Sequence, residues 1–272
     1  MFDNNIRVES VPKRVYEFCR IASQKDYSLK EIQEKLAPSE INESESVSQY
    51  FSYVKDAASE LGLIETMEND RVKFIGSREV IQDLFSFRKY CNSIVWQDKN
   101  TLFYKIASVF LESNLNWLTH KSFTTSSEVY GEIRNYIGED SDLNRHILGE
   151  RFWLSFLGFG YINERSNGIS FLPNMYIALK DFIIIADVPK NVEISISSFL
   201  NKIYKTASVA LKNIERVKQF NFAFSSALRQ LHDNKEIELK RQSDSEEIWY
   251  LFELQSHEIK REVSHITIKD LK

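Results

Sequence analysis

The feature that most constrains this chain of 272 residues is a pattern that recurs three times along it. Each copy has a stretch of helical periodicity, then a tight turn, then two short β-prone segments around a polar tip. Apolar residues spaced by three and four predict a helix, and short apolar runs around Asn, Asp or Gly predict a hairpin. The helical stretches of the three copies are residues 47–61, 145–157 and 223–231. The pattern predicts several small units, each with its own core.

The first copy follows two further predicted helices. Residues 11–23 have apolar side chains on one face, and Pro12 suits the first turn of a helix. Ser28 and Glu31 have the spacing of a capping box at the start of a second helix, which Pro38 ends. Three helices and a ribbon are therefore expected within residues 11–75. We expect Phe51, Val54 and Leu61 to be buried on the third helix.

This arrangement resembles the winged-helix superfamily, over residues 11–75, 118–173 and 197–254. The resemblance implies DNA binding or protein docking, with the third helix of each unit entering a DNA groove. Those helix faces would lie within residues 44–60, 142–155 and 222–231. The resemblance implies a mainly α fold with small β-ribbons, an α+β class, in which tandem winged-helix domains are joined by a helical connector.

The expected domains are an acidic winged-helix domain over residues 1–78, a second unit over 79–189, and a net basic winged-helix-like domain over 190–272. The second unit begins with connector helices at 78–92 and 101–115 and has a middle helix at 126–137. Residues 176–186 are expected as a helix or a buried strand. A long periodic helix is expected over 197–218. The third ribbon is expected to pair residues 236–239 with 248–252, and a further strand is expected within 263–268.

Charge separates the two ends of the chain. The formal net charge is −4, and only residues 201–272 are net basic, with 13 basic against 11 acidic side chains. Phosphate contacts depend on Lys and Arg, so the C-terminal domain is the expected DNA-binding part. The candidate DNA-binding residues are Lys202, Lys205, Lys212, Arg216, Lys218, Arg229, Lys240 and Arg241. On one helix Lys205, Lys212 and Arg216 would lie close to one stripe.

The exposed face of the first predicted recognition helix is acidic and would repel phosphate, which favours protein docking. The candidate docking residues are Glu45, Gln49, Ser52, Asp56 and Glu60. The corresponding helix of the second unit is nearly neutral, so DNA and protein remain equal alternatives there.

Catalytic signals are weak. The chain has neither glycine-rich motif of the usual nucleotide-binding loops, and its five histidines lack metal-ligand spacing. Glu238-Leu239-Lys240 is similar to the Glu-x-Lys of metal-dependent nucleases. Such a site needs another acidic residue on a neighbouring strand, and Asp233 is only a turn away. We expect no enzyme, no cofactor and no metal. Cys19 and Cys91 are expected to be buried free thiols.

No apolar stretch is long enough to span a bilayer, and we expect a soluble, cytoplasmic protein. The expected function is that of a non-enzymatic tandem winged-helix adaptor subunit in a bacterial DNA-acting complex, for DNA processing or antiviral (phage) defence. The expected partners are a larger protein subunit and, through the C-terminal domain, double-stranded DNA. No membrane partner and no small-molecule substrate are expected. The alternative is a stand-alone DNA-binding transcriptional regulator.

Overall fold

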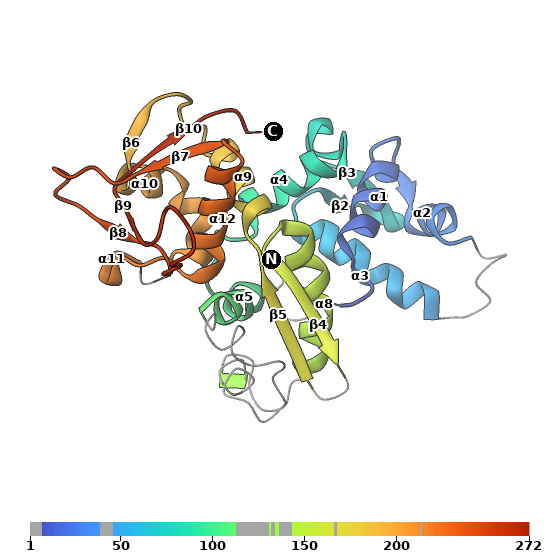
Figure 1. Cartoon of the computed structure of the whole chain (residues 1–272). Helices are drawn as coiled ribbons and strands as arrows, with labels where there is room; N and C mark the ends of the chain where they lie inside the picture. The colour runs from blue at the N-terminus through green and yellow to red at the C-terminus, as the bar shows by residue number, and fades with distance from the viewer. Residues whose placement is uncertain are drawn as a thin grey trace.

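The computed structural model describes residues 7–38, 46–112, 131, 134–135, 143–165, 168–212 and 214–271. In these parts the protein is a mixed α+β fold of helices and small antiparallel sheets. Figure 1 shows the N-terminal elements, in blue, and the C-terminal elements, in orange and red, at opposite ends, with α4 and α9 between them. The β4–β5 ribbon projects away from this row of elements.

The N-terminal unit joins helices to a three-stranded sheet in which the last strand lies in the middle, in the order β1-β3-β2. Its elements are α1 (Pro12–Ala22), β1 (Tyr27–Ser28), α2 (Leu29–Leu36), α3 (Ser46–Glu60), β2 (Ile64–Thr66), the 3-10 turn η1 (Glu68–Asp70) and β3 (Arg71–Phe74).

Local chemistry sets the boundaries of these elements. Pro12 is the first residue of α1. The predicted capping box is present: the Glu31 amide donates to Ser28 Oγ at 3.3 Å, and the Ser28 amide donates to Glu31 Oε2 at 2.7 Å. The bond from the Ser28 amide lowers the pKa of Glu31 below its usual value. Gly62 turns the chain from α3 into β2 with a φ of +68°, a conformation that glycine adopts without strain.

The predicted core of this unit is confirmed. Phe51, Val54 and Leu61 are 7%, 3% and 1% exposed. The Phe51 ring lies 5.4 Å from the ring of Phe18 on α1, measured between centroids. The helical spacing of these residues therefore points one face of α3 into the core, as the sequence indicates.

The middle of the chain contains the connector helices and the long ribbon. Its described elements are η2 (Arg78–Ile81), α4 (Leu84–Ile94), α5 (Leu102–Glu112), α8 (Leu143–Leu157), β4 (Gly160–Arg165) and β5 (Gly168–Pro173). As predicted, α8 leads directly into a two-stranded antiparallel ribbon.

The helix expected over residues 78–92 is divided. Asp83 has extended backbone and its Oδ1 accepts the Ser86 amide at 2.6 Å, so a new helix begins at Leu84. The helix expected over residues 126–137 lies largely outside the described residues, as does the end of the helix expected over 101–115.

The C-terminal unit again combines helices with a three-stranded sheet, in the order β6-β10-β7. Its elements are α9 (Tyr176–Ile185), β6 (Glu193–Ser195), α10 (Ile196–Ala207), the 3-10 turn η3 (Ser208–Ala210), α11 (Ile214–Val217), α12 (Phe222–Asp233), β7 (Ile237–Lys240), β8 (Trp249–Tyr250), β9 (Glu262–Val263) and β10 (His265–Ile268). Residues 176–185 are thus a helix.

The elements that form the two three-stranded sheets follow the same order along the chain. The series α1, β1, α2, α3, β2, β3 corresponds to α9, β6, α10, α12, β7, β10. In both sheets the third strand in sequence pairs with both of the others, in antiparallel register. On this correspondence the C-terminal unit begins with α9.

Two sequence-based predictions for this unit are wrong. The long helix over residues 197–218 ends at Ala207, because residues 208–211 are all buried and no longer present one apolar stripe. The third ribbon also differs: β7 pairs with β10, and β8 pairs with β9. Facing Ile237 with Ile268 and Leu239 with Ile266 buries all four apolar side chains, which favours this pairing.

A buried polar network joins the middle and C-terminal elements. Asp181 on α9 has no exposed surface and accepts two bonds from the Arg88 guanidinium on α4, at 2.8 and 3.1 Å. Asn92 donates to Asp181 at 2.9 Å and to the Leu157 carbonyl of α8 at 3.1 Å. Trp96 Nε1 donates to Asn92 Oδ1 at 3.2 Å. These bonds fix α4, α8 and α9 to one another.

Candidate functional site

Helix α12 holds the same place in the order of elements as α3. In the winged-helix resemblance this is the place of the recognition helix. Within this helix only Gln230 and Asp233 are exposed, and most other residues are buried. The expected open face over residues 222–231 is therefore not present. Because a groove-reading helix must present side chains outward, α12 cannot insert into a DNA groove as it lies here.

The segment between β8 and β9 covers α12. Arg229 is 4% exposed, and its guanidinium donates to the carbonyls of Phe252 and Lys260 at 2.7 Å each and of Ile259 at 2.9 Å. Burial lowers the pKa of Arg229. This candidate DNA-binding residue thus points into the protein, where its donors are occupied by the covering segment.

Two histidine–carboxylate pairs hold the same segment. His232 Nε2 lies 2.7 Å from Glu258 Oε1, and His257 Nε2 lies 3.0 Å from Asp233 Oδ1. In each ring Nδ1 accepts a backbone amide: that of Leu239 for His232, at 3.1 Å, and that of Ile259 for His257, at 3.0 Å. An Nδ1 that accepts cannot carry a proton, so the proton of each neutral ring lies on Nε2, facing the carboxylate.

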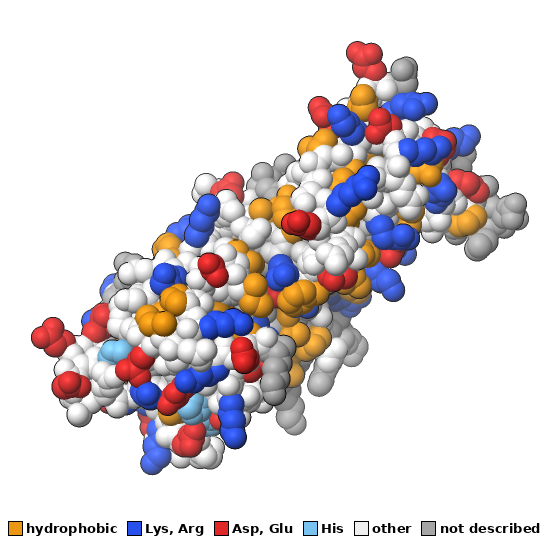
Figure 2. Space-filling model, turned by 90° about the horizontal axis from the view of Figure 1, so that it is seen from above, with side chains coloured by type: hydrophobic (Ala, Val, Ile, Leu, Met, Phe, Trp, Pro, Cys, Tyr) orange, Lys and Arg blue, Asp and Glu red, His pale blue; other side chains and the backbone are white. Residues whose placement is uncertain are grey.

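Four other candidate DNA-binding residues lie in ion pairs. The nitrogen-to-oxygen distances are 3.1 Å for Lys212 with Glu112, 3.0 Å for Lys218 with Glu247, 2.8 Å for Lys240 with Glu193, and 3.2 Å for Arg241 with Glu262. On the face seen in Figure 2, basic and acidic side chains are interspersed over the molecule. Such exposed pairs contribute little stability, about 0–1 kcal/mol each. The paired acid nevertheless offsets the positive charge that a phosphate would meet.

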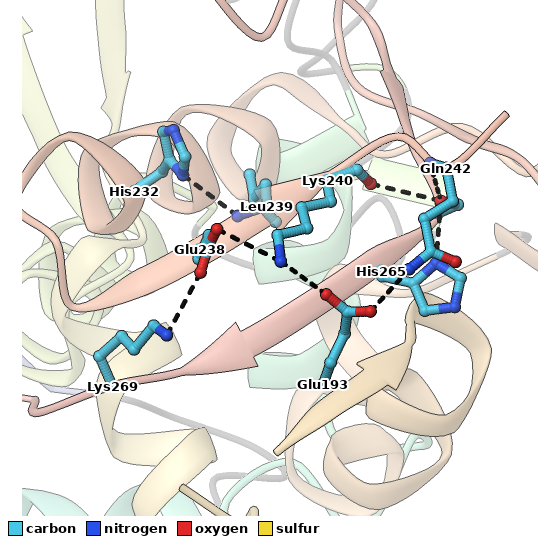
Figure 3. A network of polar contacts seen from close by, with 9 residues as sticks. Glu193, His232, Glu238, Leu239, Lys240, Gln242, His265 and Lys269 are labelled. Atoms are coloured by element: carbon cyan, nitrogen blue, oxygen red, sulfur yellow. Dashed lines mark hydrogen bonds and ion pairs between the residues drawn. The ribbon is translucent and has the colours of Figure 1, made fainter. Parts of the chain in front are cut away.

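Lys240 belongs to a network on the C-terminal sheet (Figure 3). It lies between Glu193 of β6 and Glu238 of its own strand, while Lys269 Nζ lies 3.2 Å from Glu238 Oε2. Gln242 Nε2 also donates to Glu193 at 2.6 Å. The bonds with Lys240 and Lys269 lower the pKa values of Glu193 and Glu238, respectively, and the bond to Glu193 raises that of Lys240.

The residues of the Glu-x-Lys pattern belong to this network. Glu238 contacts lysines, and Asp233 pairs with His257. Both carboxylates line one surface pocket, but each is paired there with a nitrogen-bearing side chain. Among the residues that the structure describes, no three His, Cys, Asp or Glu side chains are grouped so that they could hold a metal ion.

The remaining three candidates are exposed cations. Lys202 and Lys205 lie on α10 and Arg216 on α11, and none has an ion-pair partner within the described part of the chain. The single stripe expected for Lys205, Lys212 and Arg216 is not formed, because Lys205 lies on α10, Arg216 lies on α11, and Lys212 lies between η3 and α11.

The docking candidates lie on α3, as far as it is described. Ser52 Oγ donates to Asp56 Oδ2 at 3.5 Å, and Lys55 Nζ lies 3.5 Å from Asp56 Oδ1. Asp56 and Glu60 are exposed, on the side away from the buried apolar residues. Glu45 lies outside the described residues, and so does the side chain of Gln49. Two further exposed acids follow α3, Glu65 on β2 and Glu68 in η1.

The two thiols are confirmed as buried and free. Burial raises the pKa of Cys19 to about 12 and that of Cys91 well above its usual value. Both are neutral thiols at physiological pH, and a neutral thiol is a poor nucleophile and a poor metal ligand.

Sequence reasoning missed the residues that cover α12. It considered the five histidines only as possible metal ligands, whereas His232 and His257 join two segments. Arg229 did carry a signal, because it stands among Ala227, Leu228 and Leu231 on an apolar stretch. A charged side chain in such a place needs buried partners.

Comparisons with known proteins add no relative: no family model, no curated protein and no solved structure matches this chain. None of the helices that the structure describes combines the length and the apolarity needed to cross a membrane.

Proposed function

We propose that this protein is a non-enzymatic adaptor built from tandem winged-helix units, which docks to another protein through its N-terminal unit. The winged-helix assignment rests on the order of elements repeated in residues 12–74 and 176–268, with the last strand central in each sheet. The α8–β4–β5 segment would supply the back half of a unit between them.

The observation that carries the proposal is the contrast between α3 and α12. The two helices hold the same place in the element order, but α12 is covered and α3 leaves Ser52, Asp56 and Glu60 on an accessible face. That face is acidic, so its partner is a basic protein surface rather than DNA. We place this partner in a larger subunit of a bacterial DNA-acting assembly, one for DNA processing or antiviral defence.

DNA contact, in this proposal, is secondary and independent of sequence. Of the eight candidate residues, Lys202, Lys205 and Arg216 are exposed and have no ion-pair partner in the described part of the chain, and they could meet phosphates only. A stand-alone transcriptional regulator would need a helix that reads bases, and α12 presents no such face. The adaptor is therefore the better supported of the two functions.

The test is affinity purification at native expression, read by mass spectrometry. We expect a larger partner to co-purify with the wild type and to be lost from the double variant Asp56→Lys, Glu60→Lys. The matched control is Asp244→Lys, Glu246→Lys, which changes the charge equally at exposed positions of the other unit. A partner that survives the α3 variant, or that is lost equally from both variants, would contradict docking through α3.

The DNA contact has its own test, a binding titration at several salt concentrations. Changing Lys202, Lys205 and Arg216 to Glu should weaken binding equally for unrelated sequences. Each lost phosphate contact should also reduce the salt slope by about one unit. Unchanged binding by this triple variant would remove the surface from the proposal.

A further inference from the structure

A cavity lies between α10, α11 and β8, away from the docking face of α3. Its volume is ≈ 180 Å³. The apolar lining comes from Leu200 of α10, from Leu211 and Ile214, and from the Trp249 ring, all of them buried. Tyr204, which is partly exposed, forms one side of the opening.

The rim of this cavity carries one cation and one anion. Lys218 Nζ lies 3.0 Å from Glu247 Oε1, and the two side chains are 46% and 41% exposed, so a ligand can reach both. Ser197 donates its hydroxyl to Glu247 Oε2, and Trp249 Nε1 donates to Ser197 Oγ at 3.0 Å. The Ser197 bond lowers the pKa of Glu247.

The backbone holds the residue that carries the rim cation. Lys218 has a φ of +48°, an uncommon conformation for a residue with a side chain. Its amide donates to the Ile214 carbonyl at 2.7 Å, and its carbonyl accepts the Tyr250 amide at 2.8 Å. These bonds tie the end of α11 to β8, so the cation and the aromatic wall keep their places on either side of the opening.

The volume of the cavity and the charges on its rim restrict the ligands that it can hold. An apolar protein cavity of about 150 Å³ can hold a benzene molecule, so this one has room for a single ring or branched aliphatic group. A nucleotide is too large. A ligand that uses both rim charges must carry a cation and an anion close together, next to its apolar part. The α-ammonium, α-carboxylate and side chain of an amino acid meet this description.

We propose that this cavity binds a free apolar α-amino acid. The side chain enters among Leu200, Leu211 and Trp249, the ammonium group faces Glu247, and the carboxylate faces Lys218. One ion pair of the protein is thereby replaced by two ion pairs with the ligand. The proposal goes beyond the adaptor function and does not depend on it, because the site shares no residue with the α3 surface.

The experiment is a calorimetric titration of the full chain with L-leucine, L-isoleucine and L-phenylalanine. We expect saturable binding of at least one of them with a Kd of about 1 mM or tighter. The N-acetyl and amide derivatives of that amino acid lack the ammonium and the carboxylate, respectively, and each should bind at least tenfold more weakly. Glu247→Gln and Lys218→Met should each weaken the free amino acid tenfold or more.

The control is a second exposed ion pair of the same unit, Lys190 with Asp270, at 3.6 Å. Lys190→Met and Asp270→Asn should leave the affinity unchanged. Leu200→Phe should abolish binding by filling the cavity, and the exposed rim variants keep the test valid if this variant fails to fold. Absence of saturable binding to the wild type, or equal binding of the blocked derivatives, would overturn the proposal.

Discussion

Glu150 shows how one residue can make stability depend on pH. It lies on α8 with no exposed surface, and within the described part of the chain neither carboxylate oxygen has a hydrogen-bond partner. Burial raises its pKa well above the ordinary value of 4.5. The folded protein therefore holds a neutral carboxylic acid where the unfolded chain holds a carboxylate.

The sign of the effect follows from proton binding. Between pH 4.5 and the raised pKa of the folded state, the unfolded chain has released the Glu150 proton and the folded protein retains it. Stability is fully present below the unfolded pKa and is lost as pH rises towards the folded pKa, by at most about 1.4 kcal/mol per pH unit. We expect Glu150→Gln to remove this loss.

The measurement is urea unfolding of wild type and Glu150→Gln between about pH 5 and pH 8. The variant should gain on the wild type as pH rises. Glu65→Gln, at an exposed position of β2, is the control for the change in charge. Parallel stability curves for wild type and Glu150→Gln would show that Glu150 ionises without cost.

At the scale of elements, Arg229 is one of the residues that hold the covering segment on α12. Arg229→Met retains an apolar side chain but leaves three carbonyls without their donor. We expect a loss of roughly 2–4 kcal/mol in the free energy of unfolding, and faster hydrogen exchange of the amides in residues 251–261. Chemical denaturation and exchange mass spectrometry measure the two effects.

The matched control is Arg261→Met in the same segment. Arg261 is half-exposed and lies 3.7 Å from Glu253, so its loss should cost less than about 1 kcal/mol. If Arg229→Met leaves the exchange of residues 251–261 unchanged, the carbonyl contacts do not hold the segment.

What could be predicted at this scale was local. The capping box of Ser28 and Glu31, the burial of Phe51, and the ribbons after α3 and α8 follow from neighbouring residues, because periodicity and turns act over short distances. The pairing of β7 with β10 and the cover over α12 join segments separated by some twenty residues or more. No pattern within one segment specifies which distant segment will lie against it.

The same limit applies to the candidate site. The sequence identified the basic residues of the C-terminal unit, but it did not show which acidic residues pair with them. Glu112 and Glu193 reach Lys212 and Lys240 from distant elements. The division of the helix over residues 197–218 also could not be predicted, because Ser208 and its neighbours are buried by other elements rather than by their own helix.

At the scale of the whole molecule, the contact to test is the ion pair of Arg88 and Asp181. It joins α4 to α9, between the two ends seen in Figure 1. Arg88→Met would leave Asp181 buried without its cation, and we expect a cost of about 3–5 kcal/mol. The double variant Arg88→Met, Asp181→Leu removes both charges and should recover much of that loss.

Urea unfolding of the two single variants and the double variant gives the coupling energy between them. Arg20→Met breaks an exposed pair with Glu17 and serves as a control, with an expected cost within about 1 kcal/mol. Additive costs for Arg88→Met and Asp181→Leu would mean that the two side chains do not act together.

The position of β10 has a consequence for the way this protein is made. His265 pairs with Ser195 on one side and with Lys240 on the other, so the C-terminal sheet joins strands about seventy residues apart. On the ribosome, β6 and β7 emerge first and lack the neighbour that they share until residues 265–268 have been synthesised. The N-terminal sheet, whose strands lie within residues 27–74, is complete much earlier. The N-terminal unit can thus fold while the nascent C-terminal unit still has unpaired strand edges. Such edges can bind chaperones or pair with other chains in aggregates.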